Sequence, residues 1–214
     1  EVRVVTPLYG SVPGREQMGV RCEALRVPVG GDPARAGCRV RSLEVAPRCE
    51  AWFIEHEDFY GAREVYPARP DTAERAAFFG RAGLQACLEI GWIPDVIHCH
   101  DWTTGLLPVL LNTTLKDTPL GAAATVLTVH NVNMGERDNN DSWFNRLTLR
   151  WQYGLADHLF VHTQKMKREL ADSYGVQEKK ITVIPFGVNN ATPNTNMTVE
   201  QARKKLGVAS TDRV

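Results

Sequence analysis

The stretch that decides the fold is PDVIHCHDW, Pro94 to Trp102, near the middle of the chain. Val96 and Ile97 are β-branched residues, which suit a packed strand, and the strand ends abruptly in polar residues. Helical patterns lie before and after it, and this βαβ order predicts a parallel sheet. Ligands of such sheets bind beyond the carboxyl ends of the strands. His100 is therefore a candidate functional residue, whereas we expect His98 to be a satisfied core histidine.

Two further apolar strands end in the same way. Residues 122–129 form an almost unbroken apolar run that ends at His130-Asn131, and residues 157–161 end at His162-Thr163. An unbroken run is expected when both faces of a sheet are covered. Because parallel strands bring their carboxyl ends to one edge, these exits and His100 are predicted to converge on one crevice.

The remaining pattern completes an α/β fold. Short alternating segments from Gly19 to Val45 predict hairpin strands, and Asp71 with Glu74 forms a capping-box pattern for a helix that Gly91 ends. Further strands are expected at 3–6, 52–54 and 181–184, and further helices at 103–111, 145–156, 163–174 and 199–206. We predict a Rossmann-like, doubly wound, mainly parallel sheet.

Composition excludes several classes of protein. The chain has 214 residues, with 25 Lys and Arg against 25 Asp and Glu, so no net charge recruits nucleic acid or an anionic membrane. No apolar run is long enough for a membrane span. The five cysteines are odd in number and show no CxxC spacing, which favours reduced thiols in a cytoplasmic protein.

Several chemistries can be weighed from motifs. There is no G-x-G-x-x-G after the first strand, no Walker A sequence and no G-x-S-x-G elbow. His98 and His100 share one side of a strand, and His130 could add a third ligand for a zinc hydrolase. Against that reading, no carboxylate-rich set follows, and the chain is short for the barrels that carry such sites. We expect neither a metal nor a cofactor.

Five motifs occur in the same order as in a known family. They closely resemble bacterial glycogen and starch synthases, which are retaining glycosyltransferases of the GT-B fold with two Rossmann-like domains and a cleft between them. The motifs are VRVVTPLYG (2–10), FIEHEDFYG (53–61), DTAERAAFF (71–79), PDVIHCHDWTTGLLP (94–108) and TVLTVHN (125–131). After Asn131 the chain has Val-Asn-Met-Gly where the synthases have Tyr-Gln-Gly. Residues 139–207 are more similar to the group 1 retaining glycosyltransferases, which share the GT-B architecture.

The resemblance implies a set of site residues. His100 matches the histidine that lies against the transferred sugar, although Thr103 stands where the family has a second histidine. Implied substrate-binding residues are Asp101, Trp102, His130 and Asn131, with Asp71 and Tyr9 towards the acceptor side. Neutral hydrogen-bonding groups suit sugar hydroxyls, and Trp102 or Tyr9 could offer an apolar face.

The resemblance also implies domains and partners. Residues 1–190 would be the N-terminal GT-B domain without its first strand and Lys-x-Gly-Gly loop, and 191–214 the linker and the start of the second domain. The implied donor is ADP-glucose or UDP-glucose, the acceptor an α-glucan, and the missing C-terminal domain supplies an Arg/Lys pair and a glutamate. The alternatives are a group 1 transferase with another substrate and a non-catalytic sugar-binding or domain-interaction module.

Overall fold

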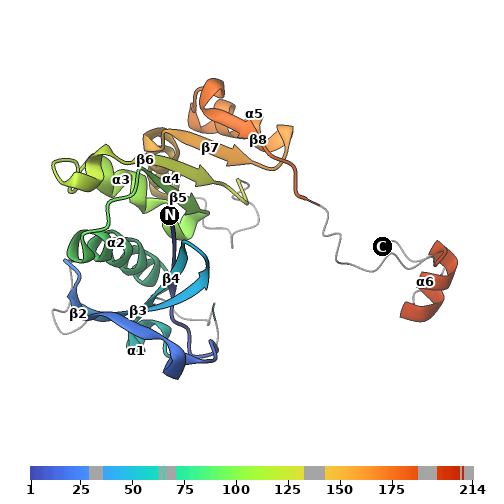
Figure 1. Cartoon of the computed structure of the whole chain (residues 1–214). Helices are drawn as coiled ribbons and strands as arrows, with labels where there is room; N and C mark the ends of the chain where they lie inside the picture. The colour runs from blue at the N-terminus through green and yellow to red at the C-terminus, as the bar shows by residue number, and fades with distance from the viewer. Residues whose placement is uncertain are drawn as a thin grey trace.

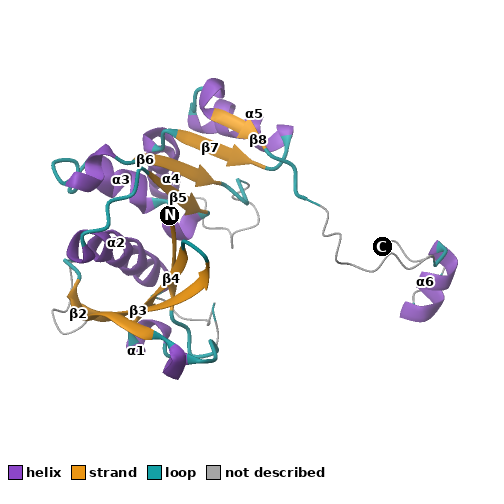
Figure 2. Cartoon of the chain, viewed as in Figure 1, coloured by secondary structure: helices purple, strands orange, loops and turns teal. Residues whose placement is uncertain are grey.

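The computed structural model describes residues 1–28, 36–62, 65, 71–132, 143–187, 197–207 and 209. The Asn-Met-Gly part of the Val-Asn-Met-Gly segment and most of the expected linker lie outside these residues. The strands of the described residues form two sheets of four strands each (Figures 1 and 2). Strand order is β1-β4-β3-β2 in the first sheet and β5-β6-β7-β8 in the second.

The first sheet is mixed and the second is entirely parallel. The first comprises β1 (Val2–Pro7), β2 (Gly19–Arg26), β3 (Gly37–Ala46) and β4 (Cys49–Glu55). In it β1 runs parallel to β4, while β3 runs antiparallel to both of its neighbours. The second comprises β5 (Val96–His100), β6 (Ala124–Thr128), β7 (His158–Val161) and β8 (Ile181–Val183). The α/β class, the parallel strands and the β2–β3 hairpin are thus confirmed.

The division into two sheets differs from the single sheet that the sequence predicts. Both β1 and β5 stand at the end of their sheet's strand order and have one strand partner each among the described residues. Their edges border one cavity of about 140 Å³, which α2 also lines. Val2, Val4 and Val96 on these two strands are 55%, 47% and 54% exposed. No described strand fills the space between the edges, so the sheet is interrupted there.

Helix α2 (Thr72–Ile90) lies between the two sheets (Figure 1). Gly91 ends it in the left-handed conformation, with φ 74°, and its N–H donates to the carbonyls of Cys87 and Leu88. Asp71 holds the N-cap position as predicted, but its side chain makes no capping hydrogen bond. The predicted capping box is therefore wrong, because the backbone of Asp71 is not in the extended conformation typical of a cap.

The other helices are shorter. They are α1 (Glu57–Tyr60), α3 (Leu106–Asn112), α4 (Trp143–Leu155), α5 (Gln164–Tyr174) and α6 (Val199–Leu206), with 3₁₀ turns η1 (Arg15–Gln17), η3 (Trp102–Thr104), η4 (Pro119–Ala122) and η6 (Glu178–Lys180). The helix predicted over 103–111 is thus a 3₁₀ turn followed by α3. Across the described ranges, no helix combines the length and the apolar character needed to cross a bilayer.

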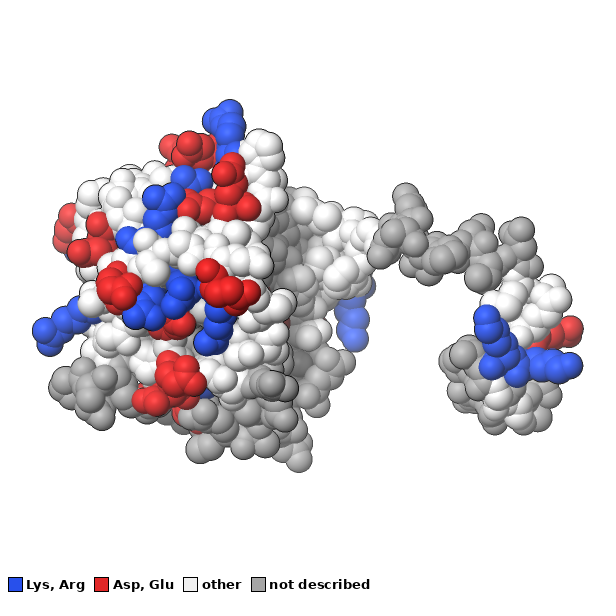
Figure 3. All heavy atoms as spheres, turned by 60° about the horizontal axis from the view of Figure 1, so that its bottom comes forward, with Lys and Arg blue, Asp and Glu red and all other residues white. Residues whose placement is uncertain are grey.

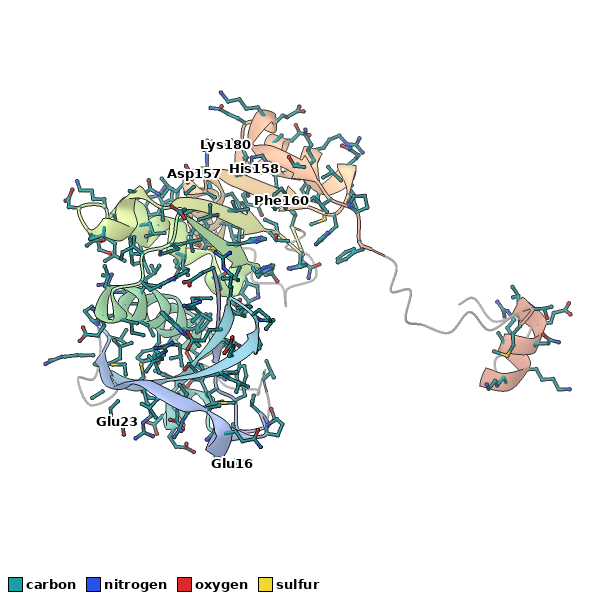
Figure 4. The ribbon with its side chains drawn as sticks, in the orientation of Figure 1. Glu16, Glu23, Asp157, His158, Phe160 and Lys180 are labelled. Atoms are coloured by element: carbon teal, nitrogen blue, oxygen red, sulfur yellow. The ribbon has the colours of Figure 1, made fainter. Side chains whose placement is uncertain are left out.

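Each sheet contributes to its own core. The first core packs Trp52 and Ile54 of β4 against Phe78 and Leu84 of α2. The second packs alternate residues of β5 to β8 against α4 and α5 through Cys99, Leu127, Leu159, Tyr153 and Leu170. The other residues of these strands face the opposite, more open side, where Figure 4 shows His158 and Phe160 on β7. The expectation that both faces are covered is therefore wrong over the described residues.

The solvent face of the first sheet carries ion pairs rather than one sign of charge. Glu55 accepts from Arg39 at 3.1 Å and from Arg41 at 2.8 Å, and Arg39 also pairs with Glu23 at 3.0 Å. Figure 3 shows acidic and basic side chains interspersed on the face that it brings forward. The Arg39–Glu23 pair is exposed, and such a pair contributes little stability, about 0–1 kcal/mol, whereas the pairs of Glu55 are partly buried. The described residues of this face therefore form no basic patch for a polyanion.

Candidate functional site

Four histidines form a continuous row at the carboxyl ends of the second sheet. The rings of His98 and His100 stack at 4.4 Å, and His100 lies 5.9 Å from His130 between ring centroids. His130 and His162 share a hydrogen bond of 3.1 Å between Nδ1 and Nε2. Phe186 stacks on His162 at 3.7 Å. We call His98, His100, His130 and His162 the histidine row. The predicted convergence of the three strand exits is confirmed.

Hydrogen bonds to the strands position most of the row. His98 Nε2 lies 2.8 Å from Thr128 Oγ1 on the neighbouring strand β6, and His162 Nδ1 lies 3.0 Å from the carbonyl oxygen of Ile184. The prediction of a core position for His98 is wrong: its side chain is exposed, because β5 is an edge strand with an open face. The His100 ring makes no hydrogen bond to any residue that the structure describes. Its two nitrogens are therefore available to a ligand.

His98 and His100 favour the neutral imidazole. The His130–His162 hydrogen bond needs one ring nitrogen as donor and the other as acceptor. Partial burial of the ring lowers the pKa of His98 below its ordinary value of 6.5. Burial also lowers the pKa of His100, and the neighbouring charges of His98 and His130 lower it further. A neutral imidazole carries one donor and one acceptor, which matches a sugar hydroxyl.

We expect acid to destabilise the chain through these two histidines. Their pKa is lower in the folded than in the unfolded chain, so the unfolded state binds more protons as pH falls below about 6.5. The stability present above that pH is lost as pH falls towards the lowered folded pKa values. Urea unfolding of wild type and His100→Gln between pH 7.5 and 5.0 measures this loss.

A shallower pH dependence is expected for His100→Gln than for wild type. The matched control is His158→Gln, because His158 lies on the same open face but bonds to Thr182 Oγ1 at 2.9 Å rather than to the row. Parallel pH profiles for wild type and His100→Gln would show that His100 does not contribute to acid sensitivity.

Asp101 stands in a strained backbone conformation directly after β5. Its φ of 59° and ψ of −173° lie in a region that is essentially reserved for glycine. The turn is held because Asp101 N–H donates to the carbonyl of Thr128 at 2.8 Å, and Thr104 N–H donates to the carbonyl of Asp101 at 3.2 Å. Such strain costs about 1–3 kcal/mol and gathers at functional sites. The turn carries the chain from His100 into η3 and places Trp102.

A second feature, which we call the aromatic cavity, lies beside this turn. It has a volume of about 100 Å³, and its lining includes Tyr9, Tyr60, Arg75, Phe79 and Trp102. Two of the predicted substrate-binding residues, Tyr9 from the exit of β1 and Trp102 from η3, are thus brought together. Asp71 adjoins Thr72, which also lines the cavity, and Asn131 is exposed beside His130.

Sequence reasoning missed several residues of this site. Arg75 and Tyr60 line the aromatic cavity, and Phe186 extends the histidine row through its contact with His162. The signal for Arg75 was its position four residues after Asp71, which puts both on one helix face. His162 ends a predicted strand, so its place in the row followed from the same rule that selected His100.

A larger cavity lies elsewhere. It has a volume of about 490 Å³ and is lined by mostly apolar residues of α2 and α3, including Phe78, Leu106 and Leu110. We assign the site to the strand exits instead, because polar groups from several strands converge there and binding sites of parallel sheets form at that edge.

The described geometry does not favour a metal. Within the described ranges, no three His, Cys, Asp or Glu side chains are arranged to hold a metal ion. His98 and His100 stack face to face rather than converge on a point. The zinc-hydrolase hypothesis therefore gains no support from this part of the chain.

Comparisons with known proteins give the family. The model of the starch synthase catalytic domain matches residues 1–181. The chain belongs to the starch synthase family. The match runs past Asn131, so the starch synthase family also covers much of the segment that is similar to group 1 transferases.

Individual starch and glycogen synthases agree with this assignment. The glycogen synthase of Treponema denticola is 35% identical over 137 residues, and glycogen synthase 1 of Geobacter sulfurreducens is 38% identical over 139, each covering 62% of this chain. The glycogen synthase of Photobacterium profundum is 32% identical over 199 residues, or 91% of this chain. The matched regions are 28%, 28% and 37% of those proteins, so the chain spans about a third or less of their length.

A solved structure supports the fold. The catalytic domain of starch synthase IV from Arabidopsis thaliana, bound to ADP and acarbose, superimposes with a TM-score of 0.67 at 17% identity. The similarity covers 99% of this chain and 53% of the Arabidopsis chain. At this identity it shows the fold alone, which is that of a starch synthase catalytic domain of the GT-B type.

Proposed function

We propose that this chain is the N-terminal catalytic part of a retaining glycosyltransferase that moves glucose from ADP-glucose or UDP-glucose to an α-glucan. The observation that carries the proposal is the histidine row, which meets the strained turn at Asp101 and the aromatic cavity at one sheet edge. The names of the bacterial relatives support a glucan product. The ADP and acarbose held by the Arabidopsis protein support a nucleotide-sugar donor.

The proposed roles follow the positions of the side chains. His100 lies at the end of β5, and its ring makes no hydrogen bond to a described residue. It donates a hydrogen bond to the transferred glucose. Asp101, His130 and Asn131 border the same sugar. On the acceptor side, Tyr9 and Trp102 offer flat apolar faces to the glucan, since aromatic rings with a polar edge suit sugar rings. Asp71, at the start of α2, contacts acceptor hydroxyls.

We also propose that transfer needs a second domain. Departure of the nucleoside diphosphate builds negative charge, and catalysis requires groups already aimed at it. No Lys or Arg of the described residues belongs to the histidine row; Lys165, Lys167 and Arg168 lie on α5, where Lys167 pairs with Glu178 at 3.8 Å. Residues 1–190 would form the N-terminal domain, and 191–214 the linker and the start of its partner. This division is supported by the described core residues, none of which comes from α6.

The chain alone is therefore expected to be inactive. Radiolabelled glucose from ADP-glucose or UDP-glucose should enter glycogen at the rate of a no-protein control. A chimera in which residues 1–181 replace the matching segment of the Photobacterium glycogen synthase should be active. Clear incorporation by the isolated chain would contradict the two-domain requirement, and a folded but inactive chimera would contradict the transferase proposal.

The same experiment distinguishes the transferase proposal from its main alternative, a non-catalytic sugar-binding module. If the isolated chain binds glycogen tightly while the folded chimera stays inactive, the chain is a non-catalytic sugar-binding module. Incorporation from a different nucleotide sugar would identify a group 1 transferase with another substrate.

We further propose that the protein works in the cytoplasm. All five cysteines are free, and burial raises the pKa of Cys99 to about 12 and of Cys87 to about 11. Thiols of this kind are protonated and unreactive at neutral pH. Unpaired cysteines are typical of reducing compartments.

A further inference from the structure

Arg75 is a buried cation without a counter-ion among the residues that the structure describes. Its side chain is 5% exposed, and its Nε has no hydrogen-bond partner. Among the described residues, no Asp or Glu forms an ion pair with it. Arginines are almost never this buried unless they are paired, because a charge removed from water needs compensation from nearby groups. The uncompensated guanidinium therefore calls for an explanation.

The surroundings of Arg75 hold it in place without neutralising it. Its guanidinium carbon lies 5.7 Å from the ring centroid of Tyr60 and 6.0 Å from that of Tyr9. Tyr60 is itself 2% exposed, and its hydroxyl donates to the Arg75 carbonyl at 2.8 Å. The two rings attract a cation through their faces, but they do not accept the in-plane N–H donors. Those donors therefore remain available in the aromatic cavity that Arg75 lines.

A second arginine on the same helix shows the ordinary arrangement. Arg81 is half-buried on α2, and its guanidinium donates to Thr114 Oγ1 and Gln85 Oε1, each at 3.4 Å. These neutral acceptors bind the two terminal nitrogens of Arg81, although its Nε, like that of Arg75, has no partner. Arg75, six positions earlier, is more deeply buried, its guanidinium has no acceptor among the described residues, and it lines a cavity at the sheet edge where ligands bind.

We propose that Arg75 makes the aromatic cavity a binding site for one oxyanion, either a phosphate or a carboxylate group. A guanidinium presents planar, paired donors that match both groups bidentately. A negative charge supplies the compensation that the buried cation lacks. The walls formed by Tyr9 and Trp102 limit access of water, which strengthens the attraction between the two charges. The oxyanion site shares Tyr9 and Trp102 with the proposed acceptor side, but its requirement for a negative charge is separate from sugar transfer, in which the acceptor is neutral.

Thermal unfolding and calorimetry of the 214-residue chain test this proposal. Melting temperature and binding heat are measured with inorganic phosphate, acetate and chloride at equal ionic strength, for wild type, Arg75→Met, Arg75→Lys and the matched control Arg81→Met. Phosphate or acetate should raise the melting temperature of wild type and of Arg81→Met above the chloride value, because a ligand of the folded state stabilises it. Arg75→Met should weaken anion binding at least about tenfold.

In chloride, without an oxyanion, we expect Arg75→Met to lose its disadvantage in melting temperature. There Arg75→Met should melt at the same temperature as wild type or higher, because it removes an uncompensated buried charge. Arg75→Lys, which keeps the charge but loses the paired donors, should retain weaker anion binding. A response to phosphate alone would assign a phosphoryl ligand, and equal responses would assign any small oxyanion. If wild type does not respond to either anion, or if Arg75→Lys and Arg75→Met respond as strongly as wild type, the proposal is wrong.

Discussion

His100→Ala in the chimeric synthase is expected to lower the turnover number by tens to hundreds of fold. His100 is the member of the histidine row whose ring makes no hydrogen bond to a described residue. A sugar hydroxyl can therefore form a hydrogen bond with one of its ring nitrogens. Loss of one hydrogen bond that strengthens in the transition state costs on the order of 2–4 kcal/mol. The initial rate of glucose incorporation at saturating donor measures the effect.

The control for this result is His158→Ala. His158 belongs to the same sheet face but lies outside the row. Its removal should leave turnover within about twofold, the range expected for a change that removes no transition-state contact. Circular dichroism would confirm that both variants fold. Unchanged turnover in His100→Ala would exclude a catalytic role, and equal losses in both variants would point to a structural effect instead.

Trp52→Ala is expected to destabilise the chain by about 3–5 kcal/mol, the range for truncating a buried aromatic residue. Trp52 is 1% exposed on β4, and its ring packs edge-on against Trp92 at 5.8 Å between centroids. Removing it leaves a void beneath α2, on the side of the sheet that supports the aromatic cavity. A loss of this size is a large share of the 5–15 kcal/mol that stabilises a typical domain.

Urea unfolding of Trp52→Ala measures this loss. Trp52→Phe, which keeps part of the packing, should lose less than half as much. Trp151→Ala is the matched control, because Trp151 is 55% exposed on α4 and its removal should change stability by less than about 0.5 kcal/mol. A loss in Trp52→Ala no larger than in Trp151→Ala would show that the first core is not packed as described.

The edge of the second sheet could be predicted from sequence because two simple rules act together. Apolar runs such as residues 122–129 identify strands of a parallel sheet, and parallel strands place their polar exits together. His100, His130 and His162 followed directly from these rules. The helix end at Gly91 and the cap at Thr163, whose Oγ1 accepts from the Met166 N–H at 3.1 Å, depend only on neighbours in the chain.

Other features depend on contacts that local sequence does not encode. The exposure of His98 follows from the position of β5 at the end of its sheet, and no pattern within Pro94–Trp102 indicates how many neighbours that strand has. No helical pattern indicates the burial of Arg75, because its neighbours Tyr9 and Tyr60 are distant in sequence. The strain at Asp101 likewise arises from hydrogen bonds to β6 across the turn.

The two open strand edges of β1 and β5 have a consequence for how copies of this chain behave together. Each edge presents a row of backbone N–H and C=O groups without a strand partner among the described residues, beside exposed Val2, Val4 and Val96. Such an edge pairs with any extended segment that reaches it, whichever molecule supplies it. Pairing between molecules therefore competes with monomeric behaviour as concentration rises. Self-association and aggregation would begin at these two strands, while the ion-paired face of the first sheet remains in contact with water.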